Sequence, residues 1–211
     1  MRQGGCMTER LPRLHPPFAD PHRQALHAAL VGGRRGTGPQ AFDLTAPDGS
    51  LIGPFGLMLQ VPHLGEPLQE LGAAVRFATS LDDRAREVAI LTVAAVTRSD
   101  FEQYAHERVG SMVGLDDTEL EALRGGVFAH RQGVDPVEAM VCTVAGRLAE
   151  RLPLDDDEYR TAVGVLGERC LLELVVLVGY YAMLAQMMSV FGVGAPDIAA
   201  ARALPEGTLR A

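Results

Sequence analysis

Apolar side chains recur at helical spacing along most of the chain, and capping residues, prolines and glycines separate the resulting segments. The stretch 80–114, SLDDRAREVAILTVAAVTRSDFEQYAHERVGSMVG, predicts two consecutive amphipathic helices. Ser80 is expected to cap the first helix, and Ser99 the second, with Glu102 as its capping-box partner. The same reasoning predicts further helical segments at 20–31, 57–60, 66–79, 115–125, 135–151, 155–167 and 168–191.

Alternating patterns typical of strands are almost absent, and the connections between the helical segments are short. These features predict an all-α helical bundle. Its domain is expected to span residues 20–194, after a flexible Pro- and Arg-rich arm at 1–19 and before a tail at 195–211. A chain of 211 residues is long enough to bury a sizeable core.

The most apolar segment is 170–191, CLLELVVLVGYYAMLAQMMSVF, which carries a single charge at Glu173. Its length would suit a membrane span. However, Glu173 and Gln186 interrupt the segment, and its paired tyrosines lie in the middle rather than at the ends. We therefore expect a buried helix of a bundle or of a subunit interface, with no membrane partner. Assembly into a homo-oligomer, such as a dimer, trimer or hexamer, is expected.

Composition excludes several classes of function. The chain contains no lysine among its 19 basic residues, which rules out lysine Schiff-base chemistry and lysine-anchored pyridoxal phosphate. Its net charge of -8 argues against nucleic acid as a partner, although the first 36 residues are rich in arginine.

Cysteines and other ligand-type residues predict neither a disulfide framework nor a metal site. Cys6, Cys142 and Cys170 are widely spaced and form no CxxC motif, which is typical of a reducing cytoplasm. His106 with Glu102 supplies only two ligands on one helical turn, so no metal site is predicted. Because no glycine-rich phosphate loop follows a strand, no nucleotide is expected, and the protein is expected to need no cofactor.

The two central helices carry most of the residues suited to proton transfer. Glu102 and His106 are four positions apart and share a face of the second helix, so the Glu102 carboxylate is expected to hydrogen-bond the imidazole, with Tyr104 on the flank. On the first helix, Arg84 and Glu87 are three positions apart. An acid, an imidazole and a second acid on adjacent helices predict a proton-transfer site. Two structural alternatives stay open: Glu102 as only a helix-cap residue, and Glu87 as the ion-pair partner of Arg84.

Four segments, in order, resemble the carboxymuconolactone decarboxylase family, which includes the alkylhydroperoxidase D-like (AhpD-like) proteins. They are GPFGLMLQVPHLG at 53–65, R-x-x-E-x-A-I-L at 84–91, Y-x-H-E at 104–107 and ELVVLVGYYAMLA at 173–185. The resemblance covers most of residues 10–192, and it implies a helical bundle of the family's type that assembles into a homo-oligomer.

In the peroxidase branch of that family, a glutamate precedes a C-x-x-C motif, and a histidine follows the second cysteine by four residues. On this chain the resemblance places the glutamate at Glu87 and the histidine at His106. The two cysteine positions are occupied by Ser99 and Glu102, so thiol–disulfide chemistry is not expected there. The chain is therefore more similar to the decarboxylase-type branch, which lacks the CxxC motif.

The resemblance implies a cofactor-free lyase or isomerase that transfers a proton on a small carboxylated lactone or a related carbonyl compound. His106, Glu102 and Glu87 are the expected catalytic residues, with His106 as the proton shuttle. Substrate contacts are expected from Arg84, Tyr104, Tyr180, Tyr181, Phe55, Met58 and His63. Two alternatives stay open: a peroxidase-type antioxidant protein, which the missing cysteines disfavour, and a non-catalytic helical oligomer that binds a partner.

Overall fold

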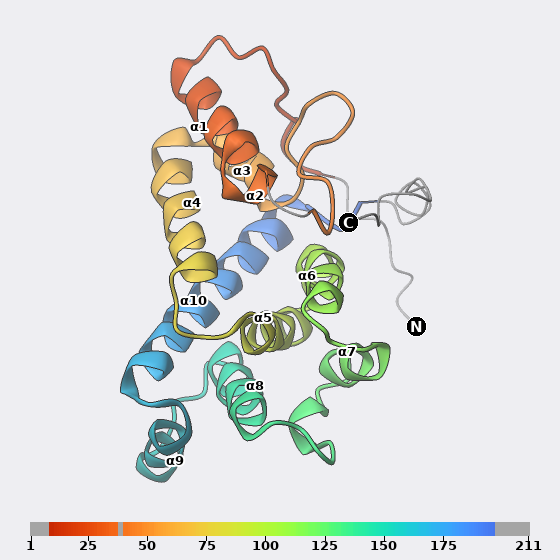
Figure 1. The fold of residues 1–211 in the computed structure, drawn as a ribbon. Coiled ribbons are helices and arrows are strands. Elements are labelled where there is room, and N and C mark those ends of the chain that lie inside the picture. The colour runs from red at the N-terminus through yellow and green to blue at the C-terminus, as the bar shows by residue number, and fades with distance from the viewer. Residues whose placement is uncertain (1–8, 38–39, 197–211) are drawn as a thin grey trace.

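The computed structural model describes residues 9–37 and 40–196, and this part of the chain is helical with no strand (Figure 1). The predicted all-α fold class is therefore confirmed. The helices in chain order are α1 (Pro21–Gly32), α2 (Arg34–Thr37), α3 (Pro54–Gln60), α4 (Pro62–Phe77), α5 (Asp83–Thr97), α6 (Asp100–Met112), α7 (Asp117–Arg124), the 3-10 turn η1 (Phe128–His130), α8 (Pro136–Ala149), α9 (Asp156–Leu166) and α10 (Glu168–Phe191).

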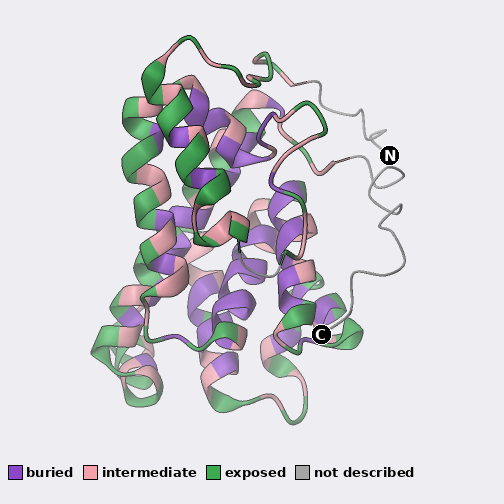
Figure 2. Cartoon of the chain, turned by 45° about the horizontal axis from the view of Figure 1, so that its top comes forward, coloured by how far each residue is buried: buried purple, intermediate pink, exposed green. Residues whose placement is uncertain are grey.

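Helix α5 lies at the centre of the bundle, and α6, α7, α8 and α10 pack against it. Its residues from Ala85 to Ala94 are all buried, because the run from Val88 onward is apolar around the whole helix. Figure 2 shows this arrangement as buried residues on the inner helices and exposed residues on the outer turns. The part of α5 that carries Glu87 is therefore enclosed by neighbouring helices.

Helix α10 crosses the bundle and packs against α3, α4, α5, α8 and α9. By length and composition, the stretch Asp156–Phe191 is apolar enough to cross a membrane, a test that core helices of globular proteins also pass. One side of α10 is buried, including Leu174 and Leu177. The other side exposes an apolar face, which we call the α10 outer face, formed by Leu172, Val175, Val176, Met183 and Val190.

Several helix ends differ from the sequence-based prediction. Asp82, and not Ser80, caps α5, because the Asp82 side chain accepts a hydrogen bond from the Ala85 amide at 2.7 Å. The Ser80 amide and hydroxyl instead donate to Glu173 at 2.6 and 2.5 Å. Helices α3 and α4 each begin earlier than predicted, at Pro54 and Pro62, because proline is well suited to the first turn of a helix.

The N-terminal arm, predicted to be flexible, is non-helical and contacts the body over its described residues, 9–19. The Arg10 amide donates to the Phe191 carbonyl at 2.9 Å, and its Nη1 donates to the Val190 carbonyl at 2.7 Å. These bonds attach the arm to the C-terminal end of α10. Residues 1–8, and the tail from 197 onward, lie outside the described residues.

Candidate functional site

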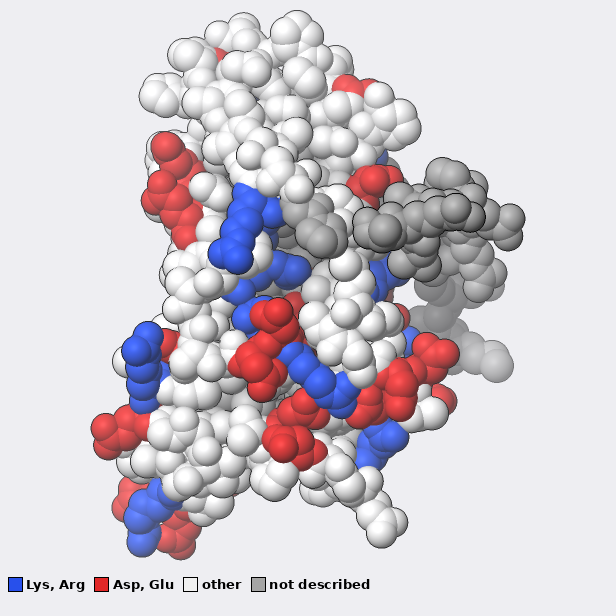
Figure 3. All heavy atoms as spheres, in the orientation of Figure 1, with Lys and Arg blue, Asp and Glu red and all other residues white. Residues whose placement is uncertain are grey.

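A cavity of about 500 Å³ lies where α5, α6 and α10 meet the segment from α2 to α4. On the face seen in Figure 3, basic and acidic side chains gather in the band between α2 and α5. The ionisable side chains that line the cavity are four arginines and three carboxyl groups, accompanied by a histidine and two tyrosines. They are Arg34, Arg35, Arg76, Arg86, Asp83, Glu87, Glu102, His106, Tyr180 and Tyr181.

Glu87 and His106 form a hydrogen-bonded pair in the cavity wall. The Glu87 Oε2 atom lies 2.6 Å from the His106 Nδ1 atom, and both side chains are buried. A carboxylate accepts, so Nδ1–H donates, and the other ring nitrogen, Nε2, is left for a ligand. The Tyr181 ring packs edge-on against the imidazole at 5.1 Å between centroids, which limits rotation of the ring. The packing of α5 on α6 thus brings together two of the predicted catalytic residues.

Glu102 is a buried carboxyl group that lines the same cavity. It is 2% exposed, and neither carboxyl oxygen has a hydrogen-bond partner among the described residues. Burial raises the pKa of Glu102 to about 8, with the nearby Ser99 side chain acting in the opposite direction. The group is therefore mainly protonated at neutral pH and can donate a hydrogen bond or a proton.

Two expectations about Glu102 were wrong. The hydroxyl of Ser99 makes no capping hydrogen bond at the start of α6, so no capping box forms there. The predicted hydrogen bond between Glu102 and His106 is also not formed, because Glu87 holds the imidazole through Nδ1. Glu102 is thus a second, independent acid in the cavity.

Arg84 lies outside the cavity, contrary to its predicted contact with substrate. Its guanidinium donates to Glu138 at 2.6 Å and to Glu119 and the Gly114 carbonyl at 2.5 Å each. The ion pair with Glu87, left open above as a structural alternative, is not formed, since Glu87 has His106 and Arg76 as its partners. Arg84 therefore ties α5 to α7 and α8.

The other predicted contact residues divide between the cavity and the rest of the fold. Phe55, Tyr180 and Tyr181 line the cavity. Met58 is in the core, and His63 is exposed on the first turn of α4. Tyr104 also lies outside the cavity lining, beneath the Arg108 guanidinium at 3.8 Å.

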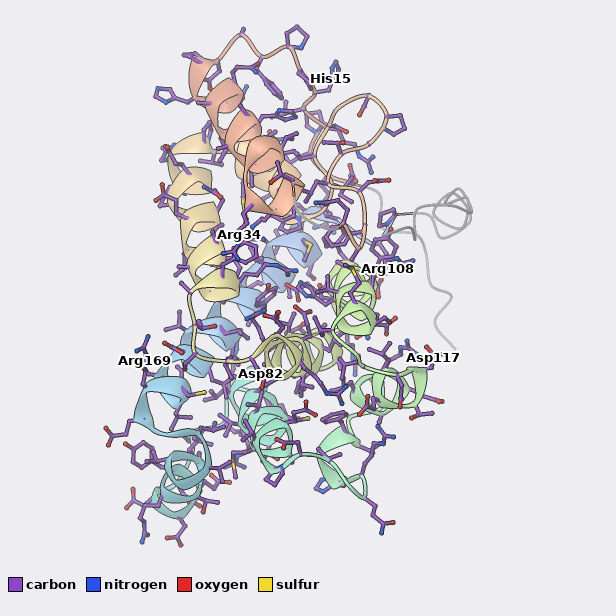
Figure 4. All side chains as sticks on the ribbon, in the orientation of Figure 1. His15, Arg34, Asp82, Arg108, Asp117 and Arg169 are labelled. Carbon is purple, nitrogen blue, oxygen red and sulfur yellow. The ribbon has the colours of Figure 1, made fainter. Side chains whose placement is uncertain are left out.

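The cavity arginines were not predicted, and they come from three helices, α2, α4 and α5, that meet only in the folded protein. Arg76 approaches Glu87 at 3.8 Å from the end of α4. Arg34, labelled in Figure 4, comes from α2 and lies over the Phe77 ring, 4.5 Å from its centroid. Arg86, on α5, pairs with Asp83. With Glu102 protonated, arginines outnumber carboxylates around the cavity, which favours an anionic ligand.

No thiol lies at the Glu87–His106 pair within the described residues. Cys142 is buried beside Thr92, whose hydroxyl lies 3.4 Å from its sulfur, and Cys170 is half-buried at the start of α10. Burial raises the pKa of both thiols, which lowers their reactivity. The same part of the chain contains no cluster of three metal-ligand side chains.

Comparisons with known proteins agree with this fold. Residues 62–145 match the model of the carboxymuconolactone decarboxylase family, so the resemblance to that family is confirmed over the segment that holds Glu87, Glu102 and His106. A comparison with curated protein sequences finds no significant match.

Solved structures with AhpD-like folds are similar over most of the chain. A peroxidase-related protein with an alkylhydroperoxidase AhpD core, from Ralstonia eutropha, has a TM-score of 0.68 at 11% identity, covering 90% of this chain and 93% of its own. A variant of the debrominase Bmp8, in complex with 2,3,4-tribromopyrrole, has a TM-score of 0.66 at 9% identity, covering 92% and 97%. A protein of unknown function from Agrobacterium tumefaciens, an AhpD-type antioxidant defence candidate, has a TM-score of 0.61 at 13% identity, covering 67% and 96%. At these identities the likeness concerns the fold.

Proposed function

We propose that the protein is a cofactor-free enzyme of the lyase or isomerase type, acting by proton transfer on a small carboxylated lactone or related carbonyl compound. The observation that carries the proposal is the Glu87–His106 pair, buried in the wall of a cavity of about 500 Å³ that also holds Glu102. A cavity of this size suits a single small ring compound. The excess of arginine over ionised carboxylate favours a substrate with a negative charge.

His106 is the proposed acid–base residue. Its Nδ1–H is held by Glu87, so Nε2 faces the reacting carbon as the base when the ring is neutral. When Nε2 takes a proton, the Glu87 carboxylate stabilises the resulting imidazolium. Histidine suits this role because its ordinary pKa lies near neutrality.

The chemistry balances without a cofactor. In an isomerisation, Nε2 removes a proton beside the carbonyl, the electron pair moves into an enolate, and the same proton returns at a different carbon. In a decarboxylation, His106 begins the cycle protonated: the bond to the leaving carboxylate breaks, CO₂ departs with no charge, the dienolate takes the Nε2 proton, and the neutral ring regains a proton from water. In both cases the protonated Glu102 can donate a hydrogen bond to the developing oxyanion.

Two features of the site disfavour a thiol peroxidase. Ser99 and Glu102 occupy the positions at which the peroxidase branch has cysteines, and the two described cysteines lie outside the cavity lining. A purely binding role is also disfavoured, because a binding cavity has no need of an oriented imidazole beside a protonated acid.

The proposal is tested by incubating the protein with a panel of lactone acids and following ring protons and released CO₂ by NMR. We expect turnover of at least one member, and a loss of roughly two to four orders of magnitude in His106→Gln. His130→Gln, at a histidine outside the cavity lining, is the matched control. If His106→Gln kept the wild-type rate on a substrate so found, the proposed mechanism would be wrong.

A further inference from the structure

Three polar atoms at one side of the cavity are buried and have no hydrogen-bond partner among the described residues. They are the Nε and Nη2 atoms of Arg35 and the hydroxyl of Tyr180. Tyr180 is 3% exposed, and both residues line the cavity. A buried donor that makes no hydrogen bond costs free energy, so such groups usually have a binding role or a partner outside the chain.

Two of these atoms, the Tyr180 hydroxyl and Arg35 Nη2, lie against one point of α4, at Gly72. A Cβ added at Gly72 would lie 2.1 Å from the Tyr180 hydroxyl and 2.7 Å from Arg35 Nη2. Glycine therefore leaves the space that the two side-chain ends occupy. The Arg35 guanidinium also lies over the Phe55 ring, 5.4 Å from its centroid, which helps to fix its plane.

The unpartnered edge of Arg35 has the geometry of a carboxylate-binding edge. The Nε–H and Nη2–H bonds lie in the guanidinium plane and point the same way along one edge. They can donate two parallel hydrogen bonds to two oxygens. Arg13 uses this same edge on Glu9, with Nε and Nη2 at 2.8 and 2.6 Å from the two carboxylate oxygens. Arg84 uses it on Glu138, at 2.6 and 3.4 Å.

Tyr180 adds a third donor beside that edge. Burial raises the pKa of Tyr180, with the charge of Arg35 and hydrogen bonding from its nearby guanidinium acting in the opposite direction, so the phenol stays protonated at neutral pH and keeps its O–H for a ligand. A carboxylate held by two arginine N–H groups has lone pairs left for such a hydroxyl. Glu102, the second acid, lines the same cavity as Tyr180 and Arg35.

We propose that Arg35 and Tyr180 form a carboxylate-binding subsite that orients the substrate beside the Glu87–His106 pair, with Gly72 as the positioning residue. This inference rests on the proposed function for its substrate class, and it gives Arg35 the contact that the sequence suggested for Arg84. Three donors on one side of the cavity match the lone pairs on the two oxygens of a carboxylate, and the phosphate control below tests whether another anion binds as well.

The carboxylate held there is one that the product keeps. A carboxylate that departs as CO₂ loses its charge in the transition state, and strong ionic hydrogen bonds would stabilise the substrate more than that transition state. A decarboxylated substrate would therefore carry a second acid group, placed away from Arg35. It also follows that a product retaining the first carboxylate should bind nearly as well as the substrate.

Isothermal titration calorimetry on the full chain tests the subsite directly. Three probes are used. The first is γ-butyrolactone-γ-carboxylate, in which the lactone carries a carboxylate on its γ carbon, and the two controls are neutral γ-butyrolactone and inorganic phosphate. We expect the carboxylate to bind at least roughly tenfold more tightly than either control, because the neutral lactone lacks the charged group that the three donors hold and phosphate lacks the ring that fills the rest of the cavity. Equal binding of the lactone with and without its carboxylate, tighter binding of phosphate, or no binding of the carboxylate would overturn the proposal.

The carboxylate affinities of single-residue variants show which side chains contribute to binding. Arg35→Gln is expected to weaken carboxylate binding by roughly 10- to 100-fold and Tyr180→Phe by roughly 3- to 10-fold, with little change for the neutral lactone. Arg34→Gln removes a neighbouring charge but none of the three unpartnered atoms, so a loss below roughly threefold is expected. If Arg35→Gln and Arg34→Gln weakened binding equally, general charge attraction would explain the result and the subsite would be rejected.

Gly72→Ala tests the positioning role with no change of charge. The added methyl displaces both Tyr180 and Arg35, so carboxylate affinity should fall by roughly tenfold or more. Gly164→Ala, in α9, makes the same change where nothing lies within 4 Å, and it should bind as the wild type does. Circular dichroism checks that each variant is folded, and wild-type affinity in a folded Gly72→Ala protein would contradict the inference.

Failure of this inference can be told apart from failure of the proposed function. If the wild type turned over a lactone acid while Arg35→Gln bound the carboxylate normally, only the subsite would be wrong. If carboxylate binding depended on Arg35 and Tyr180 but no lactone acid reacted, the subsite would stand and the proposed reaction would be wrong. His106→Gln should keep carboxylate affinity within roughly threefold while it loses turnover.

Discussion

Replacing Glu102 by glutamine should change how the stability of the protein depends on pH. In the folded protein the pKa of Glu102 is raised to about 8 by burial. In the unfolded chain a glutamate titrates near its ordinary value of about 4.3. Between these two values the folded state binds the proton more tightly than the unfolded state, so the free energy of unfolding falls as pH rises. Glutamine keeps the shape of the neutral acid but cannot ionise.

The magnitude follows from the two pKa values. Between about pH 5 and about pH 7 the wild type should lose roughly 2 to 2.5 kcal/mol of stability through Glu102 alone. Glu102→Gln should lack this component, so its advantage over the wild type should grow by that amount across the range. Urea denaturation of both proteins at each pH gives the difference, in which the other titrating groups cancel. A difference that did not change with pH would show that Glu102 is ionised in the fold, and the assignment of a protonated acid in the cavity would be refuted.

Three further predictions concern the pair, the thiols and the assembly. Glu87→Gln should lower turnover by roughly tenfold to a thousandfold, because the amide can donate to His106 Nδ1 and so favour the tautomer protonated at Nε2. Glu119→Gln, outside the cavity, is the control. Equal losses of turnover in the two variants would contradict the role of Glu87 in holding His106. Replacement of Cys6, Cys142 and Cys170 should leave turnover largely intact, and the wild type should reduce no peroxide with thiol reductants; thiol-dependent peroxide turnover would show that the chemistry is misplaced. Light scattering should give a multiple of 22.6 kDa, because the α10 outer face exposes Leu172 at 66%. Val176→Glu should lower that mass and Val127→Glu, beside η1, should not; a wild-type monomer at micromolar concentration, or a protein soluble only in detergent, would contradict assembly through this face.

Sequence reasoning predicted the helices well because their signals are local. Capping residues and apolar spacing act within one segment. The predicted bounds of α5, α6, α8 and α10 therefore agree with the observed bounds to within a few residues. The misplaced cap at Ser80 has a long-range cause. Its amide and hydroxyl bind Glu173, a residue of α10 that no local pattern connects to it.

The site was predicted only in part, for the same physical reason. Glu87 and His106 lie on neighbouring helices, and the resemblance to the family suggested that they belong to one site. Spacing on a single helix suggested Glu102 as the partner of His106 and Arg84 as that of Glu87, whereas contacts between helices decide both. Arg35 was missed because α2 reaches the cavity only through tertiary packing, and it lies between the helical segments predicted at 20–31 and 57–60.

Hydrogen–deuterium exchange on carbon tests proton transfer by His106 most directly. A lactone acid that binds the protein is incubated in deuterium oxide, and the signals of the protons beside its carbonyl are followed by NMR. This readout requires proton removal and return, but no net reaction. We predict that the wild type accelerates the loss of these signals, that His106→Gln abolishes most of the acceleration, and that His130→Gln keeps it. Equal exchange with His106→Gln and the wild type would contradict the assignment of His106 as the acid–base residue.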